Sequence, residues 1–348
     1  MSFIKNLFCD EKKGESAVLV DISADSVAGA YAHRKEGEAP VLIYSRRLPI
    51  MARTDEPSER AMLRALAILG DDLIREGAPA LLRATGSGSA GIVLVSVDTP
   101  WQETSVRTEN FERESPFVFT EDMVAMTLEK TRVIPVGKIL ADESIIGATL
   151  NGYETRNPYG KKARRASVAV LTSCIDAGIS EAITAALQSA YHTKNILHIA
   201  GSSLRYQAMR AAFPHERDAL ILDATGPLIS IALVRQGLFV ALSEVASTAP
   251  HCSRIDIITG ELADLAKHYP LPRTIFLLAR ESEVATLRET LGTVHFSTLW
   301  LSDNPPTIVP VLASHLVGLV QQATAAPPDL QLLLMALFYQ HRTAGKKG

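Results

Sequence analysis

The sequence predicts an α/β protein of two related halves, with a small α+β module inserted between them. Residues 17–27 and 219–230 share one design, in which a nearly continuous apolar strand ends in an aspartate and leads into a turn of small residues and a second β-forming run. Residues 101–175 differ, because they follow the pattern strand, helix, strand, strand, which is typical of a separate module. These observations predict a duplicated architecture that is interrupted once.

Composition bounds the class of protein. The chain has 348 residues, of which 47% are hydrophobic and 21% charged, so it can bury a core and form two or three domains. The formal net charge of -3 gives no reason to expect nucleic acid. Cys9, Cys174 and Cys252 are too widely separated for a disulfide framework or a zinc site, which favours a reducing compartment. No apolar run reaches the ~20 residues of a membrane-spanning helix, and the first residues lack the features of a signal peptide, so we expect a cytoplasmic protein.

The first half, residues 15–98, is expected to form one α/β layer. The expected elements are strands at 17–21, 29–33 and 41–45, a helix at 57–75 and a strand at 91–97. The helix is predicted because apolar residues recur at helical spacing between a proline–serine start and a glycine stop. Strands that feed a helix indicate an α/β unit.

The inserted module, residues 99–175, contains one helix, for which Thr120 is the expected cap because its hydroxyl can accept an unpaired backbone N–H. Two turns follow, at 151–152 and 157–160, before a strand at 166–172.

The second half, residues 176–324, repeats the strand and helix alternation. Its expected elements are helices at 179–191, 203–213, 260–268, 283–291 and 309–322, and strands at 195–198, 220–223, 228–234, 238–242 and 274–278.

Two motifs relate this chain to a known family. The module with Leu150-Asn151-Gly152-Tyr153 and Asn157-Pro158-Tyr159-Gly160 is similar to the extra subdomain of FtsA, and Asp21-Ile22-Ser23 with Ser26-Val27 is closer to the first loop of PilM. Over residues 16–322 the chain therefore resembles the bacterial actin homologues of the FtsA and PilM group.

The resemblance implies an actin-like (ribonuclease H-like) two-lobed fold with an inserted SHS2-like subdomain. The outer subdomain of the second half is expected to be reduced, because only one helix fits between the strands at 238–242 and 274–278. The module's turn residues are candidate partner contacts: Asn151, Gly152, Asn157, Pro158 and Gly160.

In that family, the two aspartate loops hold the phosphates of a nucleotide. The corresponding positions here are Asp21, Ser23, Asp25 and Ser26 in the first loop and Asp223, Thr225, Gly226 and Ser230 in the second. Phosphates need backbone N–H groups at close range and an aspartate that holds Mg²⁺.

Both loops differ from what phosphate binding requires. Ser23 stands where the family has glycine, Asp25 adds a negative charge, and Pro227 cannot donate a hydrogen bond. Residues 279–282 replace the glycine pair that lies against adenine. We therefore expect a degenerate nucleotide site without catalytic residues, metal or cofactor. An active site for ATP and Mg²⁺ is the alternative.

Both ends carry apolar segments. Phe3, Ile4, Leu7 and Phe8 would share one face of a short helix with lysines nearby, which is the pattern of a peripheral membrane anchor. A disordered or core-docked arm is the alternative. The C-terminal tail, 325–348, has a double proline, an apolar run and a basic end. Because FtsA-like proteins carry an amphipathic C-terminal anchor, we expect membrane or partner docking through Leu333, Leu334, Leu337 and Phe338, with packing on the body as the alternative.

The function that the resemblance implies is a cytoplasmic scaffold. It would assemble protein partners, from cell division or a pilus, at the inner face of the membrane, with self-association through the inserted module. The alternatives are an active ATPase and a PilM-like component of a type IV pilus or secretion platform.

Overall fold

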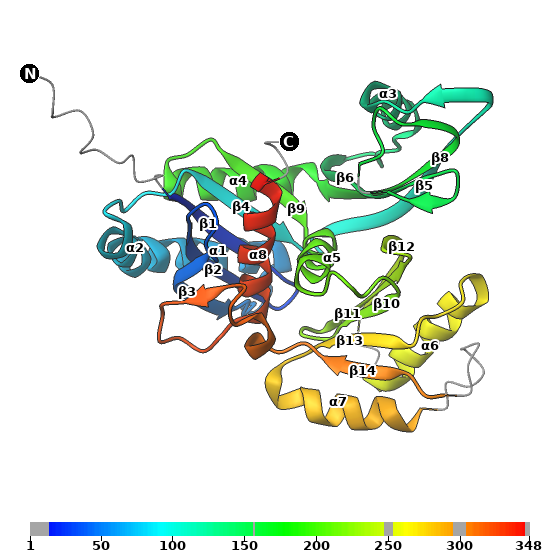
Figure 1. The fold of residues 1–348 in the computed structure, drawn as a ribbon. Helices are drawn as coiled ribbons and strands as arrows, with labels where there is room; N and C mark the ends of the chain where they lie inside the picture. Colours follow the sequence, from blue (N-terminus) through cyan, green and yellow to red (C-terminus); the bar gives the residue numbers. More distant parts are fainter. Residues whose placement is uncertain (1–13, 156, 247–252, 295–303, 345–348) are drawn as a thin grey trace, which may run out of the picture.

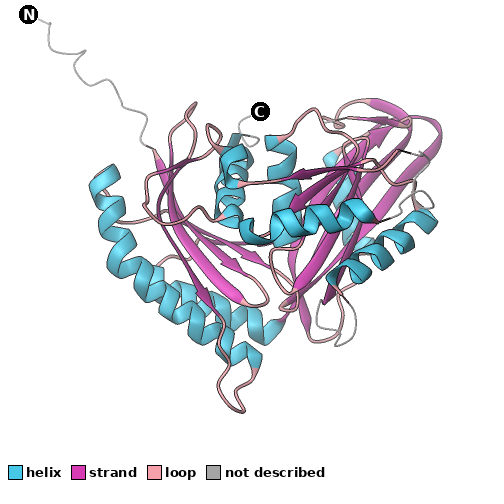
Figure 2. Ribbon diagram, turned by 90° about the horizontal axis from the view of Figure 1, so that it is seen from below, coloured by secondary structure: helices cyan, strands magenta, loops and turns pink. Residues whose placement is uncertain are grey.

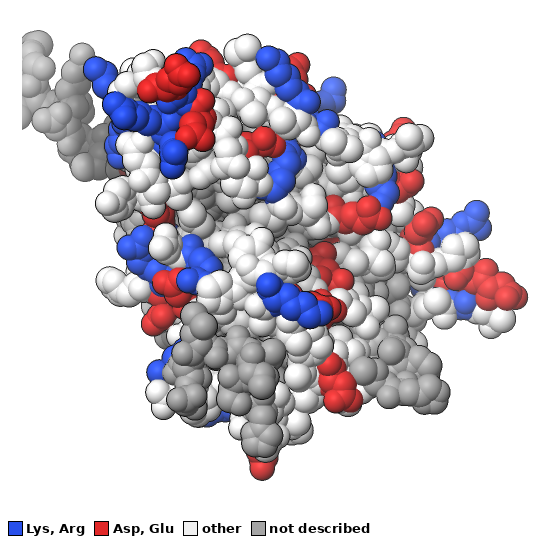
Figure 3. Space-filling view, turned by 90° about the vertical axis from the view of Figure 1, so that its right-hand side faces the viewer, with Lys and Arg blue, Asp and Glu red and all other residues white. Residues whose placement is uncertain are grey.

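The computed structural model describes residues 14–155, 157–246, 253–294 and 304–344. These residues form two α/β lobes and one inserted module (Figure 1). Seen from below, the strands fall into two groups with helices alongside them (Figure 2). On the face that Figure 3 draws, acidic and basic side chains of the described residues are mixed.

The first lobe is built on a six-stranded sheet in the order β15-β3-β2-β1-β4-β9. Its strands are β1 (Glu15–Ile22), β2 (Ser26–Arg34), β3 (Val41–Pro49), β4 (Ile92–Val97), β9 (Ile196–Ala200) and β15 (Gln321–Gln322). The apolar run of β1 is continuous because both faces of the strand are covered. Val18 and Val20 face the helices α1 (Ser58–Asp72) and α4 (Ala177–Tyr191), whereas Leu19 faces the opposite side.

The second lobe has a five-stranded sheet in the order β12-β11-β10-β13-β14. Its elements are β10 (Ala219–Asp223), β11 (Leu228–Arg235), β12 (Leu238–Ala246), β13 (Thr274–Leu278), β14 (Thr307–Pro310), α6 (Arg254–His268) and α7 (Glu281–Thr293). Between β12 and β13 the described residues hold only α6, so no second sheet stands there.

The two lobes repeat one arrangement, as the sequence predicts. β1 pairs antiparallel with β2 and parallel with β4, and β10 pairs antiparallel with β11 and parallel with β13. Asp21 and Asp223 occupy equivalent places near the ends of β1 and β10. The duplicated strand design therefore brings the two aspartates to the region between the lobes.

The helix predicted at 309–322 is wrong. This segment forms β14, a short 3-10 turn at Ala313–Leu316 and β15. Val309 pairs with Phe276 and Gln321 pairs with Val41, so the backbone hydrogen bonds go to two sheets. Pro310 also lacks the N–H that a helix interior would use.

The inserted module is a four-stranded antiparallel sheet covered by one helix. Its elements are β5 (Gln102–Val118), α3 (Glu121–Thr131), β6 (Lys138–Leu150), β7 (Tyr153–Glu154) and β8 (Lys162–Asp176), with strand order β5-β8-β6-β7. The Thr120 hydroxyl accepts the Met123 N–H at 3.3 Å, as expected of the cap. Phe119 and Leu128 belong to the core that α3 forms with the sheet.

The C-terminal helix α8 (Leu330–Ala344) is part of the body of the protein (Figure 1). It packs between the first sheet and α5 (Gly201–Ala212). The predicted docking residues Leu333, Leu334, Leu337 and Phe338 are at most 3% exposed. The expectation of membrane or partner docking is therefore corrected in favour of packing on the body. A helix that is apolar on all sides can cover two neighbours at once.

The predicted N-terminal anchor, Phe3, Ile4, Leu7 and Phe8, lies outside the described residues. Among the residues that the structure describes, no helix is long and apolar enough to cross a membrane.

Candidate functional site

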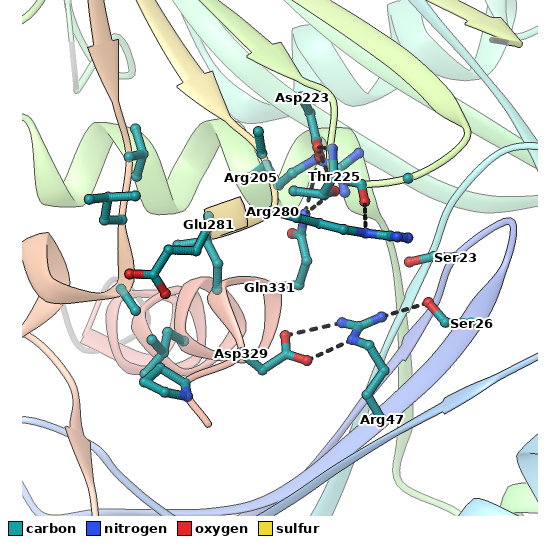
Figure 4. Close-up of a pocket in the computed structure, with 18 of the residues that line it drawn as sticks. Ser23, Ser26, Arg47, Arg205, Asp223, Thr225, Arg280, Glu281, Asp329 and Gln331 are labelled. Carbon is teal, nitrogen blue, oxygen red and sulfur yellow. Dashed lines mark hydrogen bonds and ion pairs between the residues drawn. The ribbon is translucent and has the colours of Figure 1, made fainter. Parts of the chain in front are cut away.

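A cleft of about 1030 Å³ lies between the two lobes and is lined by both aspartate loops (Figure 4). Seven of the predicted loop residues line it: Ser23, Asp25, Ser26, Asp223, Thr225, Gly226 and Ser230. Asp21 lies directly beneath, with 1% of its surface exposed. The structure thus brings the two predicted loops together although about 200 residues separate them in the sequence.

The first aspartate is neutralised by an arginine that the sequence analysis missed. Arg47, on β3, donates to Asp21 Oδ2 at 3.0 Å, to the Ser26 hydroxyl at 2.9 Å and to Asp329 Oδ2 at 2.6 Å. The Ser23 hydroxyl also donates to Asp21, at 3.0 Å. Arg47 and Ser23 thus both bind Oδ2 of the carboxylate that in the parent fold would hold or orient a magnesium ion.

Burial raises the pKa of Asp21 from its ordinary value of 3.8 to about 6, because the loss of water outweighs the attraction of Arg47. Asp98 and Asp329 act in the same direction. Burial opposes the charge of Arg47, but Asp21 and Asp329 raise its pKa above the ordinary range. At neutral pH the two side chains therefore form an ion pair.

This pKa predicts a pH dependence. Between pH 4 and pH 6 native Asp21 keeps a proton that the unfolded chain releases, so its contribution to stability falls as pH rises. The loss amounts to about 3 kcal/mol for a shift of this size. Urea titrations of the wild type and of Asp21→Asn measure this loss. Between pH 4 and pH 7 the free energy of unfolding of the wild type should fall by about 3 kcal/mol relative to that of Asp21→Asn. A difference independent of pH would show that Asp21 is not desolvated.

The second aspartate is neutralised in the same way. Arg205, on α5, is 5% exposed and its Nε lies 2.9 Å from Asp223 Oδ2. Its two terminal nitrogens donate to both oxygens of Asp98, each at 2.9 Å. Burial opposes its charge, but Asp98 and Asp223 raise its pKa above the ordinary range. If the Arg205 guanidinium moved away, both Asp98 and Asp223 would lose the cation that pairs with them.

The C-terminal segment adds contacts to both loops. Gln331 Nε2 donates to Asp223 Oδ2 and lies equally near the Thr225 hydroxyl, each at 3.2 Å. Asp329 binds Arg47 and also accepts the Leu332 N–H at 3.2 Å at the start of α8. Figure 4 shows Asp329, which directly precedes α8, next to Arg47, and Gln331, on the first turn of α8, pointing toward Asp223 and Thr225.

The second loop offers few backbone donors to a phosphate. The Thr225 N–H donates to Asp223 Oδ1 at 2.9 Å, and Pro227 has no N–H. The carbonyl oxygens of Ala224 and Gly226 both accept from Arg254, at 2.6 and 2.7 Å. The Asp223 side chain and Arg254 of α6 therefore hold the loop, which presents few free N–H groups to an anion.

Arg280 stands where the parent fold has its adenine-binding glycines. Its Nε donates to the Thr225 carbonyl at 2.9 Å and its terminal nitrogen to Asp25 at 2.8 Å. Through Asp25 this arginine links the two lobes, and Figure 4 shows its contact with Thr225. Asp25, predicted to repel phosphates, is instead the first lobe's half of this bridge.

The cleft carries a surplus of negative charge. Its lining includes three arginines and six carboxylates, which are Asp25, Asp98, Asp223, Glu244, Glu281 and Asp329. Glu244 accepts from the Thr99 hydroxyl at 2.6 Å, and burial raises its pKa. A triphosphate would add further negative charge to this environment, which Coulomb's law disfavours.

The residues of the cleft do not fit a nucleotide with its metal. Both loop aspartates are bound by arginines, and the described residues contain no group of three or more His, Cys, Asp or Glu side chains that could hold a metal ion.

The predicted contacts of the inserted module lie elsewhere. Asn151 adopts φ of 50° and its side chain accepts the Arg164 N–H at 2.9 Å, so it shapes the turn before Gly152. Asn157 and Gly160 are exposed and Pro158 is buried. None of the five lines the cleft. Their role as partner contacts stays a prediction.

Comparisons with known proteins relate the chain to one fold. No family model and no curated protein matches it. A Bacteroides thetaiotaomicron protein with an actin-like ATPase fold and unknown function is similar, with a TM-score of 0.47 and 10% identity over 95% of this chain and 98% of the other. The PilM–PilN type IV pilus biogenesis complex is similar with a TM-score of 0.50 and 13% identity, over 94% and 98%.

The Aquifex aeolicus PPX-GPPA enzyme is a more distant match, with a TM-score of 0.37 and 10% identity over 82% of this chain and 74% of that one. The match to the PilM–PilN complex supports a shared fold and nothing finer. The protein has an actin-like ATPase fold, as its resemblance to the bacterial actin homologues predicts.

Proposed function

We propose that this protein is a scaffold of the FtsA and PilM kind, which gathers protein partners at the inner face of the membrane and does not hydrolyse ATP. One observation carries the proposal: each aspartate of the phosphate loops is held in an ion pair by an arginine of the same chain. Hydrolysis in the parent fold needs a carboxylate that can bind magnesium or orient water. Here both carboxylates are already bound by arginines of the same chain.

A structural neighbour supports the choice of setting. The PilM of that structure is part of a complex with PilN in type IV pilus biogenesis. A pilus or secretion platform is therefore the setting that the structural comparison favours, and cell division is the setting that the FtsA-like turns favour. Cross-linking in the native cell followed by purification distinguishes the two by the partners recovered. Recovery of no pilus, secretion or division protein would contradict the scaffold.

The second candidate function is nucleotide binding, which the size of the cleft favours. At about 1030 Å³ it exceeds the usual volume of a small-molecule site, about 300–1,000 Å³.

Calorimetric titration with Mg·ATP separates the two functions. We expect no saturable heat and no rise in melting temperature at millimolar nucleotide, because the loop aspartates are already paired. A ligand at one hundred times its Kd would stabilise the native state by about 2.7 kcal/mol, which a thermal scan detects. Magnesium alone is the control. One-to-one binding with turnover that Asp223→Asn abolishes would contradict the proposed function.

A further inference from the structure

We propose that the cleft between the lobes receives a basic, partly apolar segment of a protein partner in the place where the parent fold holds a nucleotide. This inference rests on the proposed scaffold function and names the chemistry of the partner.

The first argument is the balance of charge in the cleft. Its three arginines already have carboxylate partners, since Arg47 binds Asp329, Arg205 binds Asp98 and Asp223, and Arg280 binds Asp25. Among the described residues, no lysine or arginine forms an ion pair with the lining carboxylates Glu244 and Glu281. These two carboxylates complement a cation that comes from outside the chain.

The second argument is the apolar part of the cleft lining. It belongs to the segment from β14 to the start of α8, where Val311, Val320 and Leu333 are already buried and Leu312, Val317 and Leu330 keep part of their surface exposed. Val317 is 79% exposed although it is a large apolar side chain at the cleft. An occupant with apolar groups would remove this surface from water, which stabilises the complex.

The occupant must satisfy both surfaces at once. A bare metal ion finds no ligand group among the described residues, and a small amine would leave the apolar part of the lining uncovered. Lysine and arginine combine an apolar stem with a charged end, and a peptide can place leucine-like neighbours beside them. A basic and apolar peptide segment therefore matches the cleft in charge and in apolar surface.

Fluorescence anisotropy tests this with the full-length protein. The probe is a labelled peptide of two arginines followed by three leucines, and its control has glutamates in place of the arginines. We expect one-to-one binding of the basic peptide that weakens as salt rises. Glu244→Gln and Glu281→Gln should each weaken it about tenfold, because each removes a charged hydrogen-bond acceptor. Glu129→Gln, on the exposed face of α3, should leave the Kd unchanged.

Three results would overturn the inference: no binding of the basic peptide at millimolar concentration, equal binding of the acidic peptide, or unchanged affinity in both cleft variants. Thermal unfolding of each variant shows that the fold is retained. The failure of the inference is distinct from the failure of the scaffold. If native partners still co-purify with Glu244→Gln and Glu281→Gln, the cleft is not their binding site. ATP turnover by the protein would refute the scaffold function, whether or not the basic peptide binds.

Discussion

Replacing Arg205 with methionine should lower the free energy of unfolding by about 4 kcal/mol. Arg205 is buried, and its loss would leave Asp98 and Asp223 without their common partner. Removing one member of a buried ion pair costs about 3–5 kcal/mol, because the remaining charge stays desolvated. Urea unfolding followed by circular dichroism measures the change.

Two further variants make this prediction specific. Arg165→Met breaks an exposed pair with Glu112 and should cost less than about 1 kcal/mol. Adding Asp98→Asn and Asp223→Asn to Arg205→Met removes the orphaned charges and should recover much of the loss, even if the single variant does not fold. A cost for Arg205→Met no greater than that of Arg165→Met would show that the buried pair is not structural.

Replacing Leu334 with alanine should lower the free energy of unfolding by about 3 kcal/mol. Leu334 is fully buried in the core that α8 shares with α5 and the first sheet, so its truncation leaves a cavity. The same variant should bind lipid vesicles no differently from the wild type, because this side chain faces the protein interior. Urea titration and vesicle co-sedimentation make the two measurements.

Leu82→Ala is the matched control for α8. Leu82 lies on α2 (Ala78–Thr85) and is 52% exposed, so its truncation should change stability by less than about 0.5 kcal/mol. If Leu334→Ala kept full stability and lost vesicle binding, the helix would serve as the membrane anchor that the sequence predicts.

The duplicated core of the fold could be predicted because its signal is local. Each aspartate directly follows a continuous apolar strand, and a turn of small residues directly follows the aspartate. The placement of α8 could not be predicted in this way. A helix that is apolar on all sides has the same sequence pattern whether it contacts lipid, another protein or its own body. Only the contacts of α8 with α5 and β1, which are distant in sequence, show that it packs on its own body.

The arginines of the cleft were missed because their partners are distant in sequence. Arg47 and Asp21 are 26 positions apart, and Arg47 and Asp329 are 282 apart. One signal was present in the sequence. Arg205 lies between Leu204 and Tyr206 in the helix expected at 203–213, and an arginine that such a helix buries requires a partner. An arginine in such a setting predicts an internal carboxylate, although not which one.

The most direct test of the account is a crystal structure grown with magnesium and a non-hydrolysable ATP analogue. We expect the pairs Arg47–Asp21 and Arg205–Asp223 to remain intact and the cleft to contain no nucleotide. A triphosphate ordered against residues 21–26 and 223–230, with both arginines turned away from their aspartates, would contradict the claim that this chain has given up the nucleotide chemistry of its fold.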